Sequence, residues 1–327
     1  MKVIDLHCDT LHEMRLAKKR GEELDLGRNS LQIDLEKLEA GDYLLQCFAL
    51  FNNLESGDDP LVGTMEMIER FQSFLQKYPG RIAQVKTMED LERNRREGKI
   101  SALLTVEEGE CCKGNLDVLR VLYSLGVRIM TLTWNYENSL GYPNTVPEGH
   151  GTLGTPNGQG LKERGIEFLA EMEKLGILVD VSHLSDGGFW DVVRHTEKPF
   201  IASHSNARAL CPHVRNLTDE MLRAIADRGG VTGINYFPFF LDVRRGEVDP
   251  VSSVKRMVDH MDYIRNLGGI GMLALGSDFD GISGEQELKD ASCLPLLAQE
   301  MDRRGYREDE IEAVFYRNAL RVLKEVL

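Results

Sequence analysis

The chain has 327 residues, of which 42% are hydrophobic and 28% are charged, and its formal net charge is −14. This composition is typical of a globular protein with a large core, and the acidic charge argues against nucleic acid or an anionic membrane as a partner. No apolar run approaches the roughly 20 residues of a membrane span, and the first residues lack the apolar region of a signal peptide, so we expect a cytoplasmic protein.

Eight short apolar runs alternate with amphipathic stretches along the chain. The predicted strands are Val3–His7, Leu44–Phe51, Ile100–Val106, Val127–Thr133, Ile177–Ser182, Pro199–Ser203, Gly230–Asn235 and Met272–Gly276. The predicted helices are Asp34–Ala40, Thr64–Lys77, Met88–Glu97, Leu116–Leu125, Leu161–Leu175, Gly187–His195, Asp219–Arg228, Val254–Leu267, Cys293–Arg304 and Glu308–Val326. Thr218 is the expected N-cap of one of these helices.

Strands that alternate with helices pair in parallel through right-handed crossovers. Eight such units in a chain of this length predict an α/β protein with a closed (β/α)₈ barrel of the TIM type, built as one domain over residues 1–327. An open doubly wound sheet is the alternative. It is disfavoured because no G-x-G-x-x-G follows the first strand and no P-loop pattern is present. The Gly- and Pro-rich stretch Ser139–Gly160 is expected to be a long loop.

Imidazole and carboxylate side chains follow five of the predicted strands. In a parallel barrel the carboxyl ends of the strands meet in one ring, where the chemistry takes place. The side chains expected in this ring are His7, Asp9, Glu107 or Glu108, His183, His204, Asp278 and Asp280. A lone histidine at a strand end is more often structural, but three after apolar runs favour a metal site. The set is too large for one tetrahedral ion and suits two ions that share a bridging carboxylate.

The pattern leaves some choices open. Glu107 and Glu108 are adjacent and point to opposite sides of an extended strand, so periodicity does not say which one faces the centre. His150 and His213 belong to loops on the same face, and their roles also stay open.

At these residues the chain resembles the membrane dipeptidase family, metallopeptidases of the amidohydrolase superfamily. The matching segments are DLHCDTL, TVEEG, LGVRIMTLT, LVDVSHLS, ASHSNAR, HVRNLTDE, INYF and GSDFDG, and they occur in the same order nearly from end to end. The resemblance implies a binuclear zinc site. It assigns His7, Asp9 and Asp278 to one ion, His183 and His204 to the other, and makes Glu107 the bridge.

The resemblance also implies how a substrate is bound. Arg215 matches the arginine with which the family holds the substrate carboxylate; the alternative is that Arg215 pairs with Asp219 or Glu220. Relatives with dipeptidase activity carry a substrate-contacting histidine where this chain has Trp134. The candidates to take over its contact are Asn135, Tyr136, Asn138 and His150, and Trp134, Asn135 and Tyr236 are expected to touch the substrate.

The expected function is hydrolysis of dipeptides, including those with a D-residue at the C-terminus, by a metal-activated water. Asp278 is the residue expected to move the proton from the water to the leaving amine. One alternative is a metal-dependent amidohydrolase acting on a non-peptide amide, lactam or lactone. Another is a non-catalytic metal-binding scaffold, which the complete ligand set disfavours. A homodimer is a further expectation, because dimers are common in the family.

Overall fold

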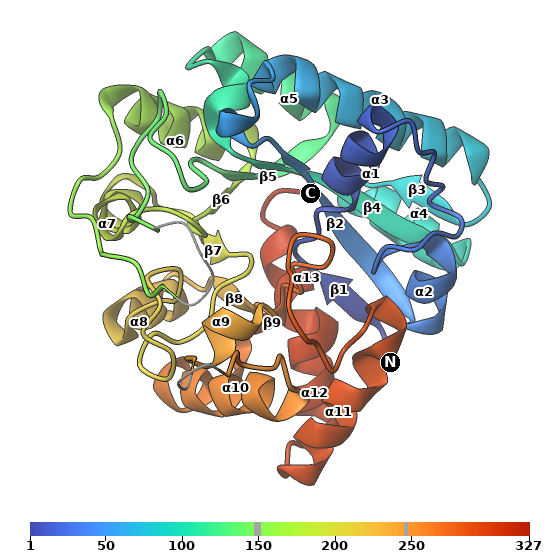
Figure 1. Cartoon of the computed structure of the whole chain (residues 1–327), viewed down its shortest axis with the longest axis vertical. Coiled ribbons are helices and arrows are strands. Elements are labelled where there is room, and N and C mark those ends of the chain that lie inside the picture. Colours follow the sequence, from blue (N-terminus) through green and yellow to red (C-terminus); the bar gives the residue numbers. More distant parts are fainter. Residues whose placement is uncertain (147–151, 245–247) are drawn as a thin grey trace.

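Parallel strands close into a barrel that is surrounded by helices (Figure 1). The computed structural model describes residues 1–146, 152–244 and 248–327. The strands of the barrel wall are β1 (Val3–Asp5), β2 (Tyr43–Phe51), β4 (Ile100–Glu107), β5 (Val127–Thr131), β6 (Leu178–Asp180), β7 (Ile201–Ala202), β8 (Val231–Ile234) and β9 (Leu273–Leu275). Each pairs in parallel with its neighbour, and pairing of β2 with β4 completes the ring. The predicted (β/α)₈ barrel is therefore confirmed.

A further short strand, β3 (Ile82–Gln84), was not among the predicted ones. It pairs with Ile100–Ala102 at the start of β4, whereas β5 pairs with β4 only from Leu104 onward. The two strands therefore share one edge of β4. Three residues are too few for a periodic pattern to appear in the sequence, which explains why β3 was missed.

The helices follow the predicted order. They are α1 (Thr10–Lys19), α2 (Leu35–Ala40), α3 (Pro60–Lys77), α4 (Met88–Arg96), α5 (Leu116–Leu125), α6 (Glu163–Leu175), α7 (Asp186–His195), α8 (Asp219–Asp227), α9 (Pro238–Leu241), α10 (Val254–Gly268), α11 (Leu294–Arg303), α12 (Glu308–Glu312) and α13 (Asn318–Leu323). The Thr218 side chain accepts a hydrogen bond from the Met221 amide, which confirms the predicted N-cap.

Three helical features differ from the prediction. Helices α1 and α9 were not predicted, and the stretch expected as one helix from Glu308 is interrupted by a π-helical turn at Ala313–Arg317. Helix α1 has few apolar side chains and begins directly after Asp9, so the sequence shows no clear boundary between strand and helix. Among the described helices, none combines the length and the apolarity that crossing a membrane requires.

Helix α13 closes one end of the barrel. Ala319, Val322 and Leu323 belong to the same buried cluster as the inward side chains of the strands, such as Ile4 and Leu103. The residues after α13 border a small cavity beside Gly176–Val179, at the amino end of β6. The carboxyl ends of the strands therefore remain free for a functional site, as in other barrels of this type.

Candidate metal centre and substrate cavity

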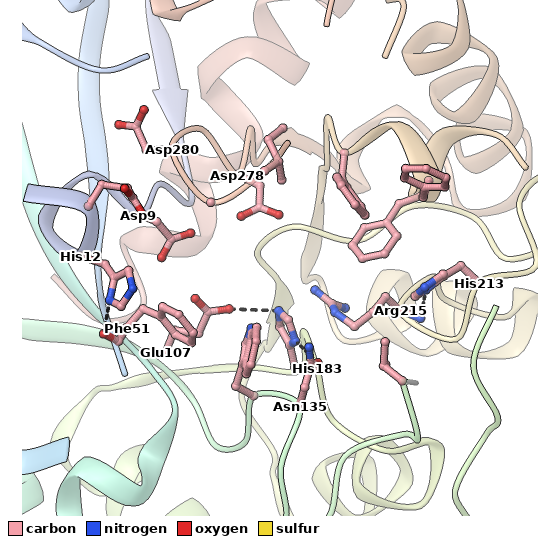
Figure 2. Close-up of a pocket in the computed structure, with 18 of the residues that line it drawn as sticks. Asp9, His12, Phe51, Glu107, Asn135, His183, His213, Arg215, Asp278 and Asp280 are labelled. Atoms are coloured by element: carbon pink, nitrogen blue, oxygen red, sulfur yellow. Dashed lines mark hydrogen bonds and ion pairs between the residues drawn. The ribbon is translucent and has the colours of Figure 1, made fainter. Parts of the chain in front are cut away.

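The predicted histidines and carboxylates converge at the carboxyl ends of the strands. They form three groups whose ligand atoms lie within 4.8 Å of one another: His7, Asp9 and Glu107; Glu107, His183 and His204; and His7, His204 and Asp278. All of these side chains are buried. Figure 2 shows the carboxylates of Asp9, Glu107 and Asp278 directed into the same space as the ring of His183. The structure thus brings together the six residues expected to bind metal.

Glu107 lies between two sets of side chains. Its Oε2 atom is 3.3 Å from Nε2 of His7, which is itself 3.4 Å from Oδ2 of Asp9. Its Oε1 atom is 3.0 Å from Nε2 of His183 and 3.5 Å from Nε2 of His204. One oxygen of Glu107 therefore faces each set, which is the position that a bridging carboxylate occupies between two ions.

The unpaired atoms at this centre fit a cation. Nε2 of His7 and Oδ1 of Asp9 are buried and have no hydrogen-bond partner among the described residues. Nε2 of His183 and Nε2 of His204 face each other at 3.0 Å. Buried polar atoms are normally satisfied, and lone pairs of nitrogen and oxygen that point at one another indicate a ligand between them.

The other ring nitrogens of two histidines are held by neighbours. Nδ1 of His183 lies 2.9 Å from Oδ1 of Asn135, and Nδ1 of His204 lies 2.7 Å from Oγ of Ser203. The Ser203 hydroxyl in turn bonds Asp180. These contacts orient the rings so that Nε2 points to Glu107, as the outer neighbours of metal ligands commonly do.

Burial keeps two of the imidazoles neutral. It lowers the pKa of His183 to about 4, with a further contribution from the Arg215 guanidinium. It also places the pKa of His204 well below its ordinary value, with help from His7. The neutral ring is the form that binds a metal ion, so both side chains are ready to act as ligands at neutral pH.

Asp278 is a buried carboxyl group surrounded by other ionisable side chains. Burial raises its pKa to about 7, and the nearby carboxylates of Asp9 and Glu107 raise it as well. Its Oδ2 atom accepts a hydrogen bond of 2.8 Å from Nδ2 of Asn235, and its Oδ1 atom lies 3.8 Å from Nε2 of His7. A carboxyl group whose pKa is close to the working pH can both take up and release a proton.

The structure distinguishes the two adjacent glutamates. Glu107 faces the candidate metal ligands, whereas Glu108 has a φ of +83° and turns away from them. Its Oε2 atom accepts a hydrogen bond of 2.9 Å from the amide of Trp134. A positive φ is unusual for a residue other than glycine. His183 and Asp278 also have a positive φ, of +68° and +62°. Such backbone conformations are unfavourable in free energy, and they occur preferentially at functional sites.

A cavity of about 470 Å³ opens over this centre. Its lining includes Asp9, Glu107, His183 and Asp278, together with aromatic side chains and the guanidinium of Arg215. The predicted contacts Trp134 and Asn135 also line it. Figure 2 shows Arg215 and His213 on one side of Glu107 and His183, with His12 and Phe51 on the other. The cavity is thus large enough for a small molecule that extends across the candidate metal ligands.

Arg215 is buried at one end of the cavity. Its guanidinium touches Ser205 Oγ at 3.3 Å and the Phe240 ring at 5.4 Å, and its Nε atom has no partner in residues 1–146, 152–244 and 248–327. No described carboxylate forms an ion pair with it. The alternative pairing with Asp219 or Glu220 is therefore wrong; Asp219 instead accepts a hydrogen bond from Tyr263. Burial lowers the pKa of Arg215 to about 10, so it remains charged at neutral pH.

One predicted substrate contact needs correction. Tyr236 is 1% exposed, packs edge-on against Phe279 in the core between barrel and helices, and does not line the cavity. Successive side chains at a strand end point to opposite sides, and here Asn235 takes the side facing Asp278. The prediction chose the larger side chain; the period-two pattern counted from β8 could have identified Asn235.

The candidates to replace the family histidine have separate positions. Asn135 lines the cavity and contacts His183. Asn138 is not part of the cavity lining and donates a hydrogen bond to Glu108. Tyr136 packs against Trp134. His150 lies outside the described residues. His213, whose role the sequence left open, lines the cavity and accepts a hydrogen bond from the Arg215 amide.

Comparisons with known proteins agree with these observations. A family model described as "Membrane dipeptidase (Peptidase family M19)" matches residues 1–327. The chain is 36% identical over 273 residues to an uncharacterized protein in the pqqA 5' region of Klebsiella pneumoniae, covering 82% of this chain and 97% of that protein. It is 34% identical over 266 residues to the dipeptidase aclJ of Aspergillus oryzae, covering 80% of this chain and 61% of that protein.

A solved structure is similar over the whole chain. It is a metallo peptidase from Rhodobacter sphaeroides, liganded with a phosphinate mimic of the dipeptide L-Ala-D-Ala. The TM-score is 0.87 at 25% sequence identity, and the match covers 100% of this chain and 99% of the other.

Proposed function

Because this chain belongs to the membrane dipeptidase family, we propose that it hydrolyses dipeptides at a binuclear zinc site. The observation that carries the proposal is the position of Glu107, with one oxygen facing His7 and the other facing His183. Arg215 is buried at the end of the same cavity and forms no ion pair with a described carboxylate, so it supplies a site for the carboxylate of a substrate. A free dipeptide has both features that this arrangement requires: an amide bond and a carboxylate one residue away from it.

The six candidate ligands would divide between two ions. His7, Asp9 and Asp278 would hold one ion, His183 and His204 the other, and Glu107 would bind both. When bound, such ions lower the pKa of a shared water and polarise the carbonyl of the scissile bond. Imidazole and carboxylate ligands are the ones that zinc uses at hydrolytic sites.

The chain's own residues position the substrate and move the proton. Arg215 holds the terminal carboxylate, and its fixed position admits one residue beyond the scissile bond. Asp278 takes the proton from the attacking water and passes it to the leaving amine, since its carboxyl group lies among the candidate ligands and faces the same cavity. Asn235 fixes the orientation of that carboxyl group.

The substrate range is proposed to include dipeptides with a D-residue at the C-terminus. The Rhodobacter sphaeroides structure with a mimic of L-Ala-D-Ala supports this range, because it shares the whole fold with this chain. We also propose a cytoplasmic location. All six cysteines are free thiols, five of them buried, as is usual in a reducing compartment.

Two measurements on the same preparation test the proposal. Elemental analysis of protein purified without chelator should give about two zinc ions per chain. Incubation with a mixed library of L,L- and L,D-dipeptides should release free amino acids, and chelation should stop the release. Zinc near zero that added zinc does not restore would overturn the binuclear site. Hydrolysis of lactams or lactones without any dipeptide hydrolysis would favour the non-peptide amidohydrolase instead.

A further inference from the structure

Three aromatic side chains pack in a row beside the cavity, and two of them, Phe51 and Trp134, line it. The ring of Trp134 lies 4.8 Å from that of Phe51 and 5.3 Å from that of Tyr136, both tilted. We call Phe51, Trp134 and Tyr136 the aromatic wall. The Trp134 ring also lies 5.9 Å from the ring of His183, so the wall reaches the candidate metal ligands.

Phe51 of the aromatic wall lies beside Glu107, on the side away from Arg215. Phe51 is the register partner of Glu107 in the pairing of β2 with β4, so the two residues are neighbours at the strand ends. On its other side the Phe51 ring packs at 4.7 Å against His12 of α1. Figure 2 shows His12 and Phe51 on one side of Glu107 and Arg215 on the opposite side.

The segment that carries Trp134 is firmly held. The Trp134 amide donates to Oε2 of the buried Glu108, and the Asn138 side chain donates to Glu108 and, at 2.8 Å, to the Leu132 carbonyl. Oδ1 of Asn138 accepts from the amides of Leu140 and Gly141 at 2.7 and 3.0 Å. The indole is therefore presented in a fixed position, which lowers the entropy lost when a ligand packs on it.

We propose that the aromatic wall binds the side chain of the N-terminal residue and selects dipeptides whose first residue is large and apolar or aromatic. The inference rests on the proposed function, because it takes the dipeptide carboxylate to lie at Arg215 and the scissile bond beside Glu107. A dipeptide placed in this way extends its first residue past Glu107, toward Phe51 and His12.

Carboxyl groups at this end of the cavity further restrict which first residues of a dipeptide are accepted. Glu13 and Asp280 line the cavity here, and Glu13 comes from the same helix as His12. These carboxyl groups attract the free amino group of the first residue and repel an acidic side chain. The wall and the carboxyl groups together favour a phenylalanine, tyrosine or leucine at the first position over glycine or glutamate.

Steady-state kinetics with dipeptides that differ only in the first residue test this selection. Wild-type kcat/KM for Phe-Ala should exceed that for Gly-Ala by about tenfold or more, as expected for filling an apolar pocket. Trp134→Ala should bring the ratio of the two kcat/KM values close to one. Trp134→Phe should lower the ratio less, because an aromatic face remains. Trp190→Ala serves as a matched control: Trp190 lies on α7 against Phe189, outside the cavity lining, and the variant should keep the wild-type ratio.

Binding can be followed without turnover. The chain has two tryptophans, so Trp190→Phe leaves Trp134 as the only indole. Phosphinate mimics of Phe-Ala and Gly-Ala should both bind, and the Phe-Ala mimic should bind more tightly and cause the larger change in Trp134 fluorescence.

The outcomes separate the two proposals. If neither mimic binds and no dipeptide is cleaved, the proposed function fails and the selection fails with it. If dipeptides are cleaved but Phe-Ala and Gly-Ala react equally, or Trp134→Ala lowers both by the same factor, the selection alone is overturned.

Discussion

The Nδ1 atom of His183 and the Oδ1 atom of Asn135 lie 2.9 Å apart, so the loop after β5 hydrogen-bonds a candidate metal ligand that follows β6. An amide oxygen only accepts hydrogen bonds, which requires the proton of His183 to be on Nδ1. Nε2 is then unprotonated and faces Glu107. Asn135 thus selects the tautomer in which His183 can bind a metal.

Removal of the Asn135 oxygen should weaken metal binding. We expect Asn135→Ala to reduce zinc affinity by roughly 10- to 100-fold, the usual effect of losing a residue that orients a metal-binding histidine. Asn135→Asp keeps an acceptor and should retain most of the affinity. Competition with a zinc chelator measures both variants, and equal affinity of Asn135→Ala and wild type would contradict the orienting role.

Asp278→Asn should abolish turnover while leaving much of the metal bound. The amide has the shape of the carboxylate and offers the metal an oxygen, but it cannot accept the proton from the attacking water. Turnover of a reference dipeptide and elemental analysis should be measured on the same sample. A variant that keeps near-normal kcat would show that another group acts as the base.

Arg215→Ala should mainly raise KM for dipeptides. The expected loss in kcat/KM corresponds to about 1.5–3 kcal/mol, as for a hydrogen bond to a charged group. Arg215→Lys should recover only part of this, because an ammonium cannot bind a carboxylate through a planar fork. Dipeptide amides are the control: they lack the carboxylate, should be poor substrates and should be little affected. Equal cleavage of amides and free acids by the wild type would rule out this role.

Asn235 and Tyr236 should differ sharply in their effects. Asn235→Ala removes the 2.8 Å hydrogen bond to Asp278 and should lower kcat with little change in KM. Tyr236→Phe removes a buried hydroxyl that has no partner among the described residues and should leave kinetics unchanged. Loss of activity in Tyr236→Phe would instead restore Tyr236 as a functional residue.

His260 should make the protein less stable in acid. Burial lowers its pKa to about 4, and the neutral ring accepts from the Ala207 amide at 3.1 Å and contacts the Leu241 carbonyl at 3.0 Å. The unfolded chain has the ordinary pKa of about 6.5 and binds a proton first as the pH falls. The contribution to the free energy of unfolding is therefore complete above about pH 6.5 and is lost toward pH 4, at a cost of roughly 3 kcal/mol.

Urea unfolding of metal-free protein at several pH values between 7.5 and 4 measures this contribution. His260→Phe should be less stable than wild type at pH 7.5, because two hydrogen bonds are lost, but its stability should fall less steeply between pH 6.5 and 4. Parallel curves for the two proteins would assign the acid sensitivity to other groups.

The sequence predicted the barrel and the ring of candidate ligands because both depend on local patterns. Apolar runs that alternate with amphipathic stretches determine which segments become strands, and parallel closure brings the carboxyl ends together. His7, Glu107, His183 and Asp278 each follow such a run, so their convergence could be predicted before any contact was known.

Tertiary structure decided which side chain of each adjacent pair faces the centre. Glu107 rather than Glu108, and Asn235 rather than Tyr236, point to the candidate metal ligands. At Glu108 the backbone leaves the strand with a positive φ, which is stabilised by hydrogen bonds from Trp134 and Asn138, about 30 residues farther along the chain. Local periodicity contains no information about such distant partners. For the same reason, two features could be identified only once the strand ends had been brought together: the lack of an ion-pair partner for Arg215 among the described carboxylates, and the packing of Trp134 on Phe51.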